Sequence, residues 1–283
     1  MKLCRFLTTA GDPSFGLIHD DSVVELSDRF ARLSELFEVD DLKALIAGLN
    51  LKGQRHFHVR DVKLLAPIDR QEVWAAGVTY LRSKTARMDE SQFGAVAYDR
   101  VYDAPRPELF FKSLPDKVVG PHDAIGIRAD AQWSVPEPEL ALVLNSRGDV
   151  VGYTIGNDMS SRDIEGENLL YLPQAKVYRR SCALGPCVVV GASEADARVW
   201  EIHMTIERKG AVVFKGKTTP GQIKRSFTEL AQYLFRSQEF QRGAVLLTGA
   251  GIVPPDDFTL RADDCVHIEI SGIGRLDNPV TVV

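Results

Sequence analysis

The stretch Pro136–Leu144, which reads PEPELALVL, places two acidic residues at the start of an apolar strand. Residues two apart on a strand point to the same face, so the carboxylates of Glu137 and Glu139 should lie side by side, roughly 7 Å apart along the strand. Carboxylates that interrupt a buried apolar pattern are costly unless something pairs with them. A hard divalent cation, which prefers oxygen ligands, is the usual compensation.

A turn signal follows this strand and predicts a hairpin. Residues 145–149 read NSRGD, which is typical of a turn, and residues 150–155 form the next apolar stretch. A hairpin centred near Gly148 would return Asp158 to the level of Glu139. Three carboxylates would then converge on one point and could share a cation. A charged strand end beside a solvated loop is the alternative that this local pattern leaves open.

The wider sequence resembles the fumarylacetoacetate hydrolase superfamily. The order Glu-x-Glu, Asn-Asp-x-x-x-Arg-Asp and then lysine is specific to that family, and here it runs from Glu137 to Lys176. Other similar blocks are GVTY at 77–80, LFFK at 109–112, LLTG at 246–249 and DCVHI at 264–268. The resemblance covers about residues 70–283. It implies that Glu137, Glu139 and Asp158 are metal ligands.

The expected fold class is α+β, with a β-rich distorted β-roll at residues 66–283 as the family implies and a small N-terminal α/β module at residues 1–65. In the module, the pattern predicts a strand at 3–7, a hairpin across 16–26 and two amphipathic helices near 28–37 and 40–49. In the main domain, alternating apolar residues predict strands at 202–206 and 266–270. Ser226 and Glu229 form a capping-box signature before an apolar helical stripe.

Composition favours an ordinary globular protein. The chain has 283 residues and a net charge of −5, without a basic stripe, so nucleic acid is not an expected partner. No apolar run reaches membrane-spanning length, and the first residues lack a signal-peptide core, so we expect no membrane partner and a cytoplasmic location. The four cysteines, at 4, 182, 187 and 265, show no zinc-site spacing and are expected to be free, mostly buried thiols.

The segment that corresponds to the family's lid departs from the pattern of its hydrolases. Those enzymes cleave a carbon–carbon bond with water that a histidine–glutamate pair activates. The lid here begins GVTYLRSKTA at residues 77–86, with Ser83 where the histidine should stand and Ala86 where the glutamate should stand. Neither side chain is a general base near neutral pH. The resemblance therefore implies that the water-activating pair is missing.

A second departure places a carboxylate where the hydrolases have an apolar residue. Glu108 directly precedes the apolar strand that carries Lys112. Partial desolvation there should raise the pKa of Glu108, which suits an acid–base residue. An exposed glutamate at a strand start is the alternative. Lys112 is expected to support the carboxylates as a nearby charge, or to be a plain surface lysine.

Dehydration needs the metal but not an activated water. A divalent ion that binds the carboxylate and 2-oxo groups of a 2-keto acid acidifies the C3 proton, and the C4 hydroxyl then leaves. Residues 79–83 (TYLRS) and 164–176 (IEGENLLYLPQAK) look like the 2-keto-3-deoxy-pentonate dehydratases of the superfamily. The expected product of a pentonate is 2-oxoglutarate semialdehyde. The alternative is a hydrolase of 2,4-diketo acids, and a binding scaffold without activity is a third hypothesis.

The resemblance also suggests roles around the metal. Glu108 is the acid–base candidate, and Lys176 would place positive charge beside the developing negative charge. Thr248 and Gly249 would offer a hydroxyl and a backbone N–H to the substrate, and Arg82 and Ser83 would bind it when the lid closes. Mg²⁺ is the favoured metal, with Mn²⁺ or Ca²⁺ as alternatives. A homodimer is expected by analogy with the superfamily.

Overall fold

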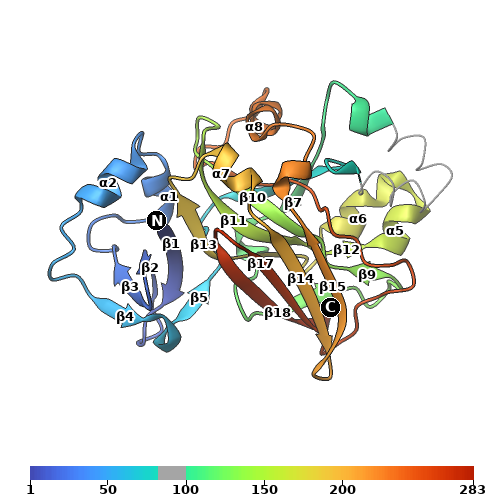
Figure 1. The fold of residues 1–283 in the computed structure, drawn as a ribbon, viewed down its shortest axis with the longest axis horizontal. Coiled ribbons are helices and arrows are strands. Elements are labelled where there is room, and N and C mark those ends of the chain that lie inside the picture. The colour runs from blue at the N-terminus through green and yellow to red at the C-terminus, as the bar shows by residue number, and fades with distance from the viewer. Residues whose placement is uncertain (82–99) are drawn as a thin grey trace.

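An eleven-stranded, mostly antiparallel sheet forms the larger part of this computed structural model, which describes residues 1–81 and 100–283 (Figure 1). The strand order is β4-β3-β2-β1-β13-β11-β10-β16-β6-β7, and β5 pairs with β1 beside this path. The bounds are β1 Lys2–Leu7, β2 Pro13–His19, β3 Ser22–Glu25, β4 His56–His58, β5 Lys63–Leu65, β6 Glu72–Gly77, β7 Glu108–Ser113, β10 Pro138–Leu144, β11 Val150–Asp158, β13 Cys182–Val190 and β16 Ala244–Leu247.

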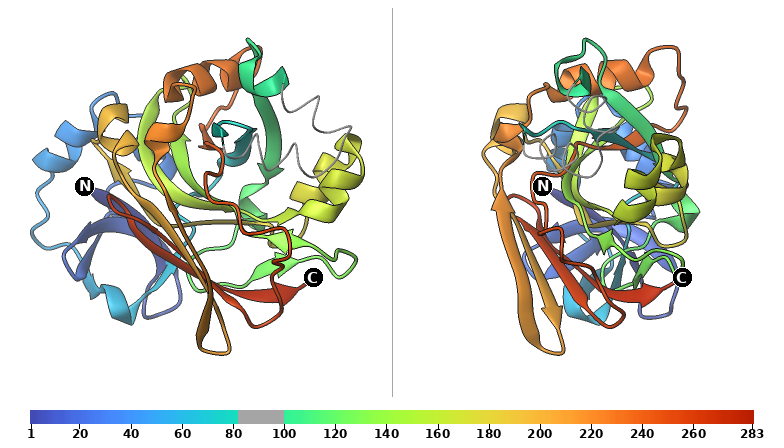
Figure 2. Two further views of the ribbon diagram at one scale, coloured as in Figure 1. Left: turned by 45° about the vertical axis from the view of Figure 1, so that its right-hand side comes forward. Right: turned by 90° about the vertical axis from the view of Figure 1, so that its right-hand side faces the viewer.

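A second sheet of five strands packs across this one, and Figure 2 shows its orange and red strands as a separate layer. Its order is β15-β14-β17-β18-β8, and a two-stranded sheet joins β12 to β9. These strands are β8 Ile125–Ile127, β9 Ser134–Val135, β12 Ser160–Ser161, β14 Ile202–Arg208, β15 Ala211–Thr218, β17 Cys265–Ile270 and β18 Gly274–Val282. The predicted β-rich α+β fold is confirmed, including the strands at 202–206 and 266–270.

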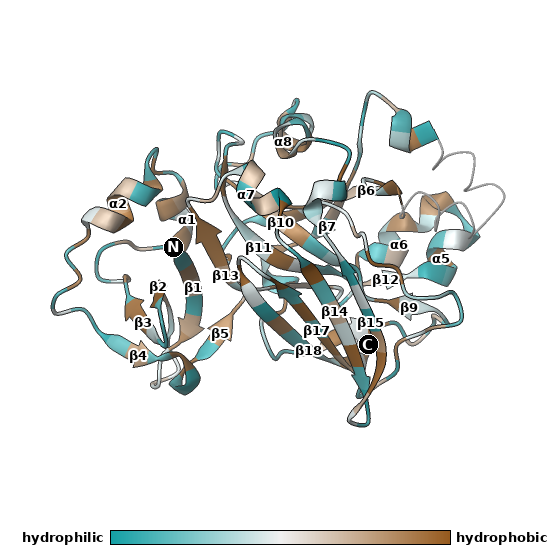
Figure 3. Cartoon of the chain, in the orientation of Figure 1, coloured by the Kyte–Doolittle hydropathy of each residue, from teal (hydrophilic) through white to brown (hydrophobic). Residues whose placement is uncertain are grey.

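Strand β10 is covered on both faces. Leu140, Leu142 and Leu144 pack into the core shared with the second sheet, whereas Ala141 and Val143 pack into a core that includes the N-terminal helices. This explains why the strand reads as a continuous apolar run rather than an alternating one. By contrast, β14 and β17 cover a core with one face only, and their alternation is visible as bands in Figure 3.

The helices are short and lie mainly around the edges of the sheets. The cap predicted at Ser226 is present, because Ser226 Oγ accepts a hydrogen bond from the Glu229 N–H at 3.0 Å. The Glu229 carboxylate, however, pairs with Arg225 at 2.6 Å instead of completing a capping box. The α-helices include α1 Leu33–Phe37, α2 Leu42–Gly48, α5 Arg162–Glu167, α6 Leu172–Lys176, α7 Glu194–Arg198 and α8 Phe227–Phe235.

The N-terminal segment continues the main sheet. The predicted hairpin is formed by β2 and β3, and β1 then pairs with β13, with Leu3 opposite Val188. The helix predicted near 28–37 is confined to α1, whereas the second prediction agrees with α2, where the Asp41 side chain accepts from the Ala44 N–H. The division of the chain at residue 65 stays a prediction.

All four cysteines are free, and three of them, Cys4, Cys182 and Cys187, are buried as predicted. Burial raises the pKa of the Cys182 thiol to about 12. A thiol with such a pKa is protonated at neutral pH and is a poor metal ligand or nucleophile. Within the described residues, no helix has the length and apolar character needed to span a membrane.

Candidate metal centre and active site

Three buried carboxylates meet at the ends of two neighbouring strands. Glu137 lies just before β10, Glu139 lies within it, and Asp158 is the last residue of β11. Each offers an oxygen, and these three atoms all lie within 4.8 Å of one another. Glu137, Glu139 and Asp158 are hereafter the triad. The predicted convergence is therefore present.

The register of the hairpin differs from the predicted one by two residues. Glu139 lies opposite Gly156, and the Asp158 N–H donates to the Glu137 carbonyl at 2.9 Å. Asp158 is thus level with Glu137 rather than with Glu139. A register irregularity between Val143 and Leu144 accompanies this shift. The carboxylates still meet, because diagonal neighbours on one face of a sheet remain within reach of each other.

Two cationic side chains neutralise Glu137. Lys176, at the end of α6, places its Nζ 2.6 Å from Glu137 Oε2 and 3.1 Å from Asp158 Oδ2. Arg162, at the start of α5, donates from Nη2 to Glu137 Oε1 at 2.7 Å. Lys176 also donates to Ser160 Oγ at 2.6 Å. Both cations are almost fully buried, so these pairs act in a low dielectric where a charge without a partner is costly.

Lys112 also supports the triad, through Asp158. Its Nζ lies 2.5 Å from Asp158 Oδ1 and donates to the Met159 carbonyl at 2.9 Å and to the Lys176 carbonyl. The side chain is 0% exposed, which confirms the supporting role and excludes a surface lysine. Lys112 therefore fixes the metal-ligand candidate Asp158 and the backbone beside Lys176 at once.

Glu139 differs from the other two acids in its partners. Its Oε2 accepts a hydrogen bond from the Gly249 N–H at 2.5 Å, and no cation of residues 1–81 or 100–283 forms an ion pair with it. Burial raises the pKa of Glu139 well above its usual value, and the nearby charges of Asp158 and Glu137 raise it further. A divalent cation would remove this electrostatic cost. The donor set, three oxygens close together, fits a hard ion such as Mg²⁺.

Glu108 lines the same small pocket as the triad. It opens β7 and lies opposite Gly77, the last residue of β6. A Cβ atom added to Gly77 would lie 2.0 Å from Glu108 Oε2, so the glycine provides the room that this carboxylate occupies. The structure thus places the acid–base candidate beside the triad.

A strained turn leads from β6 out of the pocket. Val78 has a φ of 52°, which is unfavourable for a β-branched residue. The turn is held in place because Thr79 Oγ1 donates to the Thr248 carbonyl at 2.6 Å. Gly249, with a φ of 99°, packs so closely that an added Cβ would lie 2.0 Å from Thr79 Oγ1. Strain of this kind persists where the surroundings fix it, commonly at functional sites.

The two substrate-binding candidates that follow β16 are already hydrogen-bonded within the protein, one to a backbone carbonyl and the other to a carboxylate. The Thr248 hydroxyl donates to the Leu140 carbonyl at 2.8 Å, and the Gly249 N–H donates to Glu139. Arg82 and Ser83 lie outside the described residues. A substrate contact of any of these four residues stays a prediction.

From the sequence, Arg162 and Asp163 are expected to brace the loop through a salt bridge rather than to contact the substrate, and Ser160 is given no role. In the structure Arg162 pairs with Glu137 instead and Ser160 accepts a hydrogen bond from Lys176, and no local pattern specifies either contact. Arg162 belongs to the family's Arg-Asp pair at 162–163, which is the signal that could have indicated it. Its neighbour Asp163 accepts from the Gln132 N–H at 2.6 Å and so fixes the loop instead.

Two family models match the chain. The one described as "Fumarylacetoacetate (FAA) hydrolase C-terminal" covers residues 72–281, and the one described as "Rv2993c-like, N-terminal" covers residues 1–67. A Haloferax volcanii protein named "Probable 2-keto-3-deoxyxylonate dehydratase" is 52% identical over 77% of this chain and 74% of its own. The "2-dehydro-3-deoxy-D-arabinonate dehydratase" of Saccharolobus solfataricus is 38% identical over 99% of this chain and 96% of its own.

Solved structures agree with these relatives. A structure described as 2-keto-3-deoxy-D-arabinonate dehydratase complexed with magnesium and 2,5-dioxopentanoate matches this chain with a TM-score of 0.81 and 36% identity. The match covers 100% of this chain and 99% of that one.

Proposed function

Because the chain belongs to the fumarylacetoacetate hydrolase family, we propose that it is a Mg²⁺-dependent dehydratase of a 2-keto-3-deoxy sugar acid. The substrate is a pentonate and the product is 2-oxoglutarate semialdehyde, which is 2,5-dioxopentanoate. The observation that carries this proposal is the match over the whole chain to a dehydratase complexed with magnesium and that compound. The reaction removes water, so the enzyme is a hydro-lyase.

The triad would hold the metal. Glu137 and Asp158 already have cationic partners, whereas the Gly249 N–H is the one hydrogen-bond donor to the Glu139 side chain among residues 1–81 and 100–283. Lys112, Lys176 and Arg162 balance the charge of the triad, but Glu108 and the buried Glu165 line the same pocket and add negative charge, which the bound ion would offset. When bound, Mg²⁺ supplies a Lewis acid that acidifies the C3 proton of a 2-keto acid.

Glu108 is the proposed acid–base residue. It lines the pocket with the triad but does not belong to the group of three carboxylates whose oxygens lie together. Its carboxylate takes the C3 proton and returns a proton to the C4 hydroxyl, which leaves as water and forms a C3–C4 double bond. Movement of a proton from C5 to C3 then gives the C5 enol, which tautomerises to the aldehyde of the semialdehyde. The Lys176 ammonium, held between Glu137 and Asp158, supplies positive charge where the substrate becomes more negative.

The hydrolase alternative is not favoured. A hydrolase of 2,4-diketo acids needs a group that activates water, and the sequence has Ser83 and Ala86 at the positions of the family's pair. The relatives with the higher identities carry dehydratase names. The intact triad and its buried cations also argue against an inactive scaffold.

The finer features of the protein are proposals by analogy. We propose Mg²⁺ as the physiological metal, with Mn²⁺ or Ca²⁺ as substitutes, since the donors are all oxygens. We further propose a cytoplasmic homodimer that acts in pentose breakdown on a small-molecule 2-keto acid, without a nucleic-acid or membrane partner.

The direct test offers the purified protein two kinds of substrate. Incubated with Mg²⁺ and 2-keto-3-deoxy-pentonates, it should form a semialdehyde without breaking a carbon–carbon bond. Incubated with acylpyruvates, it should leave them intact. Cleavage of acylpyruvate without any dehydration of the sugar acids would reject the proposal in favour of the hydrolase.

The role of Glu108 has a test of its own. The variant Glu108→Gln keeps the shape of the side chain and removes its acid–base chemistry. We expect turnover to fall by about 100-fold or more, while Mg²⁺ affinity measured by calorimetry stays nearly unchanged. Wild-type turnover in this variant would remove Glu108 from the mechanism without affecting the metal assignment.

A further inference from the structure

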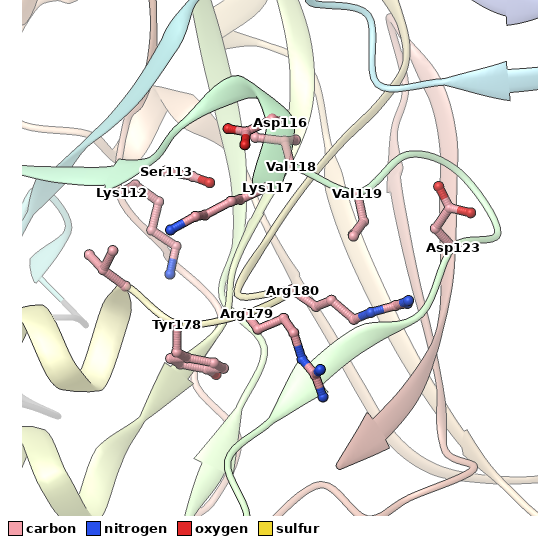
Figure 4. Close-up of a pocket in the computed structure, with 11 residues that line it drawn as sticks. Lys112, Ser113, Asp116, Lys117, Val118, Val119, Asp123, Tyr178, Arg179 and Arg180 are labelled. Carbon is pink, nitrogen blue, oxygen red and sulfur yellow. The ribbon is translucent and has the colours of Figure 1, made fainter. Parts of the chain in front are cut away.

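A second, larger cavity lies near the triad pocket, and the contact between Lys112 and Asp158 links the two linings. It is a half-open cavity of about 640 Å³ whose charged residues Lys117, Arg179 and Arg180 are exposed, and Figure 4 shows the side chains that line it. Lys112 belongs to this lining, while its Nζ contacts Asp158, which lines the triad pocket. A volume of this size is within the range of pockets that bind small molecules.

The cavity carries an excess of positive charge. Lys117 comes from the segment after β7, and Arg179 and Arg180 come from the loop after α6 on the facing wall (Figure 4). Within residues 1–81 and 100–283, none of these three cations forms an ion pair. Arg180 donates only to the Ala124 carbonyl, at 3.1 Å.

The acidic residues of the lining do not offset this charge. Asp123 pairs with Lys63 at 2.6 Å, which leaves Asp116 as the one other carboxylate on the wall. Asp116 and Lys117 are both exposed. Cations that gather around a concave surface attract anions, because low-dielectric walls concentrate their field.

We propose that this cavity binds a small dianion, such as a dicarboxylate or an oxyanion of the sulfate type. Lys117 from one wall and Arg179 and Arg180 from the other would hold its two charges. An acidic segment of a second copy of the chain is a different occupant. The concave shape and small-molecule volume favour the dianion.

The buried Lys112–Asp158 contact couples the two pockets and makes the cavity an effector site. An anion in the cavity adds negative charge near this pair, which favours a cation at the triad. This coupling rests on the proposed metal centre. By linkage, Mg²⁺ raises the affinity for the anion by the same factor as the anion raises the affinity for Mg²⁺.

Calorimetry tests the site without using activity. Sodium succinate and sodium sulfate are titrated separately into the full chain, at an ionic strength held constant with NaCl. We expect one saturable site per chain for at least one of the two, and the two titrations distinguish a dicarboxylate from an oxyanion site. Lys117→Gln and Arg179→Gln should each weaken the binding about tenfold, because each removes a charge-assisted hydrogen bond.

Matched controls remove an exposed cation elsewhere. Lys217→Gln on β15 and Arg242→Gln before β16 should leave the affinity unchanged. The proposal would be overturned if neither anion bound saturably, or if the control variants lost as much affinity as Lys117→Gln. It would also be overturned if Lys117→Gln dissociated an oligomer while succinate and sulfate had no effect. If the anion binds equally with and without Mg²⁺, the coupling is wrong and the site stands. If no pentonate is dehydrated yet the anion binds, only the proposed function fails.

Discussion

At the scale of single residues, Lys112 is a buried charge whose stability depends on a few specific contacts. It is fully buried, and its ammonium contacts Asp158 and two backbone carbonyls. Removal of Lys112 leaves Asp158 with the longer contact to Lys176, at 3.1 Å, and takes a buried donor from two backbone carbonyls. We expect Lys112→Met to lower the free energy of unfolding by about 3–5 kcal/mol, measured by urea denaturation, and to weaken Mg²⁺ binding.

A nearby lysine provides the control for this prediction. Lys117 is exposed and forms no ion pair within residues 1–81 and 100–283, so Lys117→Met should change the unfolding free energy by no more than about 0.5 kcal/mol. Equal effects of the two substitutions would contradict the buried-charge argument.

The raised pKa of Glu139 predicts how the stability of the metal-free protein depends on pH. Its pKa in the folded chain lies above the usual 4.5, because burial and then the charges of Asp158 and Glu137 disfavour ionisation. The folded state therefore holds this proton more tightly than the unfolded chain does. Metal-free protein should be most stabilised by this group below pH 4.5 and should lose that contribution as the pH rises through the raised pKa.

Urea denaturation across this range, with a chelator present, measures the effect. Glu139→Gln should remove most of the fall in stability, and Mg²⁺ added to wild-type protein should offset it at the higher pH values. If the free energies of unfolding of the wild-type protein and of Glu139→Gln changed in parallel with pH, Glu139 would ionise in the folded protein without lowering its stability.

The individual residues of the site were predictable to different degrees. Glu137, Glu139 and Asp158 stand out because each interrupts an apolar pattern in a short stretch of sequence. Arg162 and the contact of Lys112 with Asp158 depend on elements far apart in the chain, and no local periodicity contains that information. Charge balance predicts that cations are needed but not which ones.

At the scale of secondary structure, the pairing of β6 with β7 positions Glu108. Its carboxylate occupies the space left open by Gly77. Gly77→Ala should displace that carboxylate and lower turnover by about 100-fold, with Mg²⁺ affinity unchanged. Gly48→Ala in α2, where an added Cβ meets nothing within 4 Å, is the matched control and should keep full turnover. Steady-state kinetics with the pentonate and metal titrations of both variants make the comparison.

The strands and helices show that strand register and helix length are not predicted by local sequence patterns. The hairpin β10–β11 was predicted from its turn, yet its register was wrong by two residues, since the pairing irregularity near Val143 has no sequence signal. The helix expected near 28–37 is short for a similar reason. Its apolar residues Leu33, Leu36 and Phe37 are buried, whereas the preceding residues form turns whose conformation depends on the strands around them.

At the scale of the whole molecule, the N-terminal segment and the site share one sheet. Leu3 on β1 pairs with Val188 on β13, and β13 pairs in turn with β11, which carries Asp158. Removal of residues 1–65 would leave β13 as an unprotected edge and expose its apolar partners. We expect the truncated chain to aggregate during size-exclusion chromatography. The full chain should unfold in one transition that fluorescence and circular dichroism report alike.

A truncated chain that stays monodisperse and binds Mg²⁺ as tightly as the full chain would contradict this expectation. It would mean that residues 66–283 form an independent unit, as the two adjoining family matches at 1–67 and 72–281 also allow.

The burial of β10 on both faces limits the size of the cation that the triad can bind. Oxygen ligands lie about 2.0–2.1 Å from Mg²⁺ but about 2.3–2.6 Å from Ca²⁺. Glu139 projects from a strand whose backbone cannot shift without disturbing two cores. Longer metal–ligand distances would therefore require Glu137 to move, because it lies just before the strand and not within it. The scaffold should therefore discriminate by size, and a larger ion would enter at the expense of the Glu137 contacts with Arg162 and Lys176.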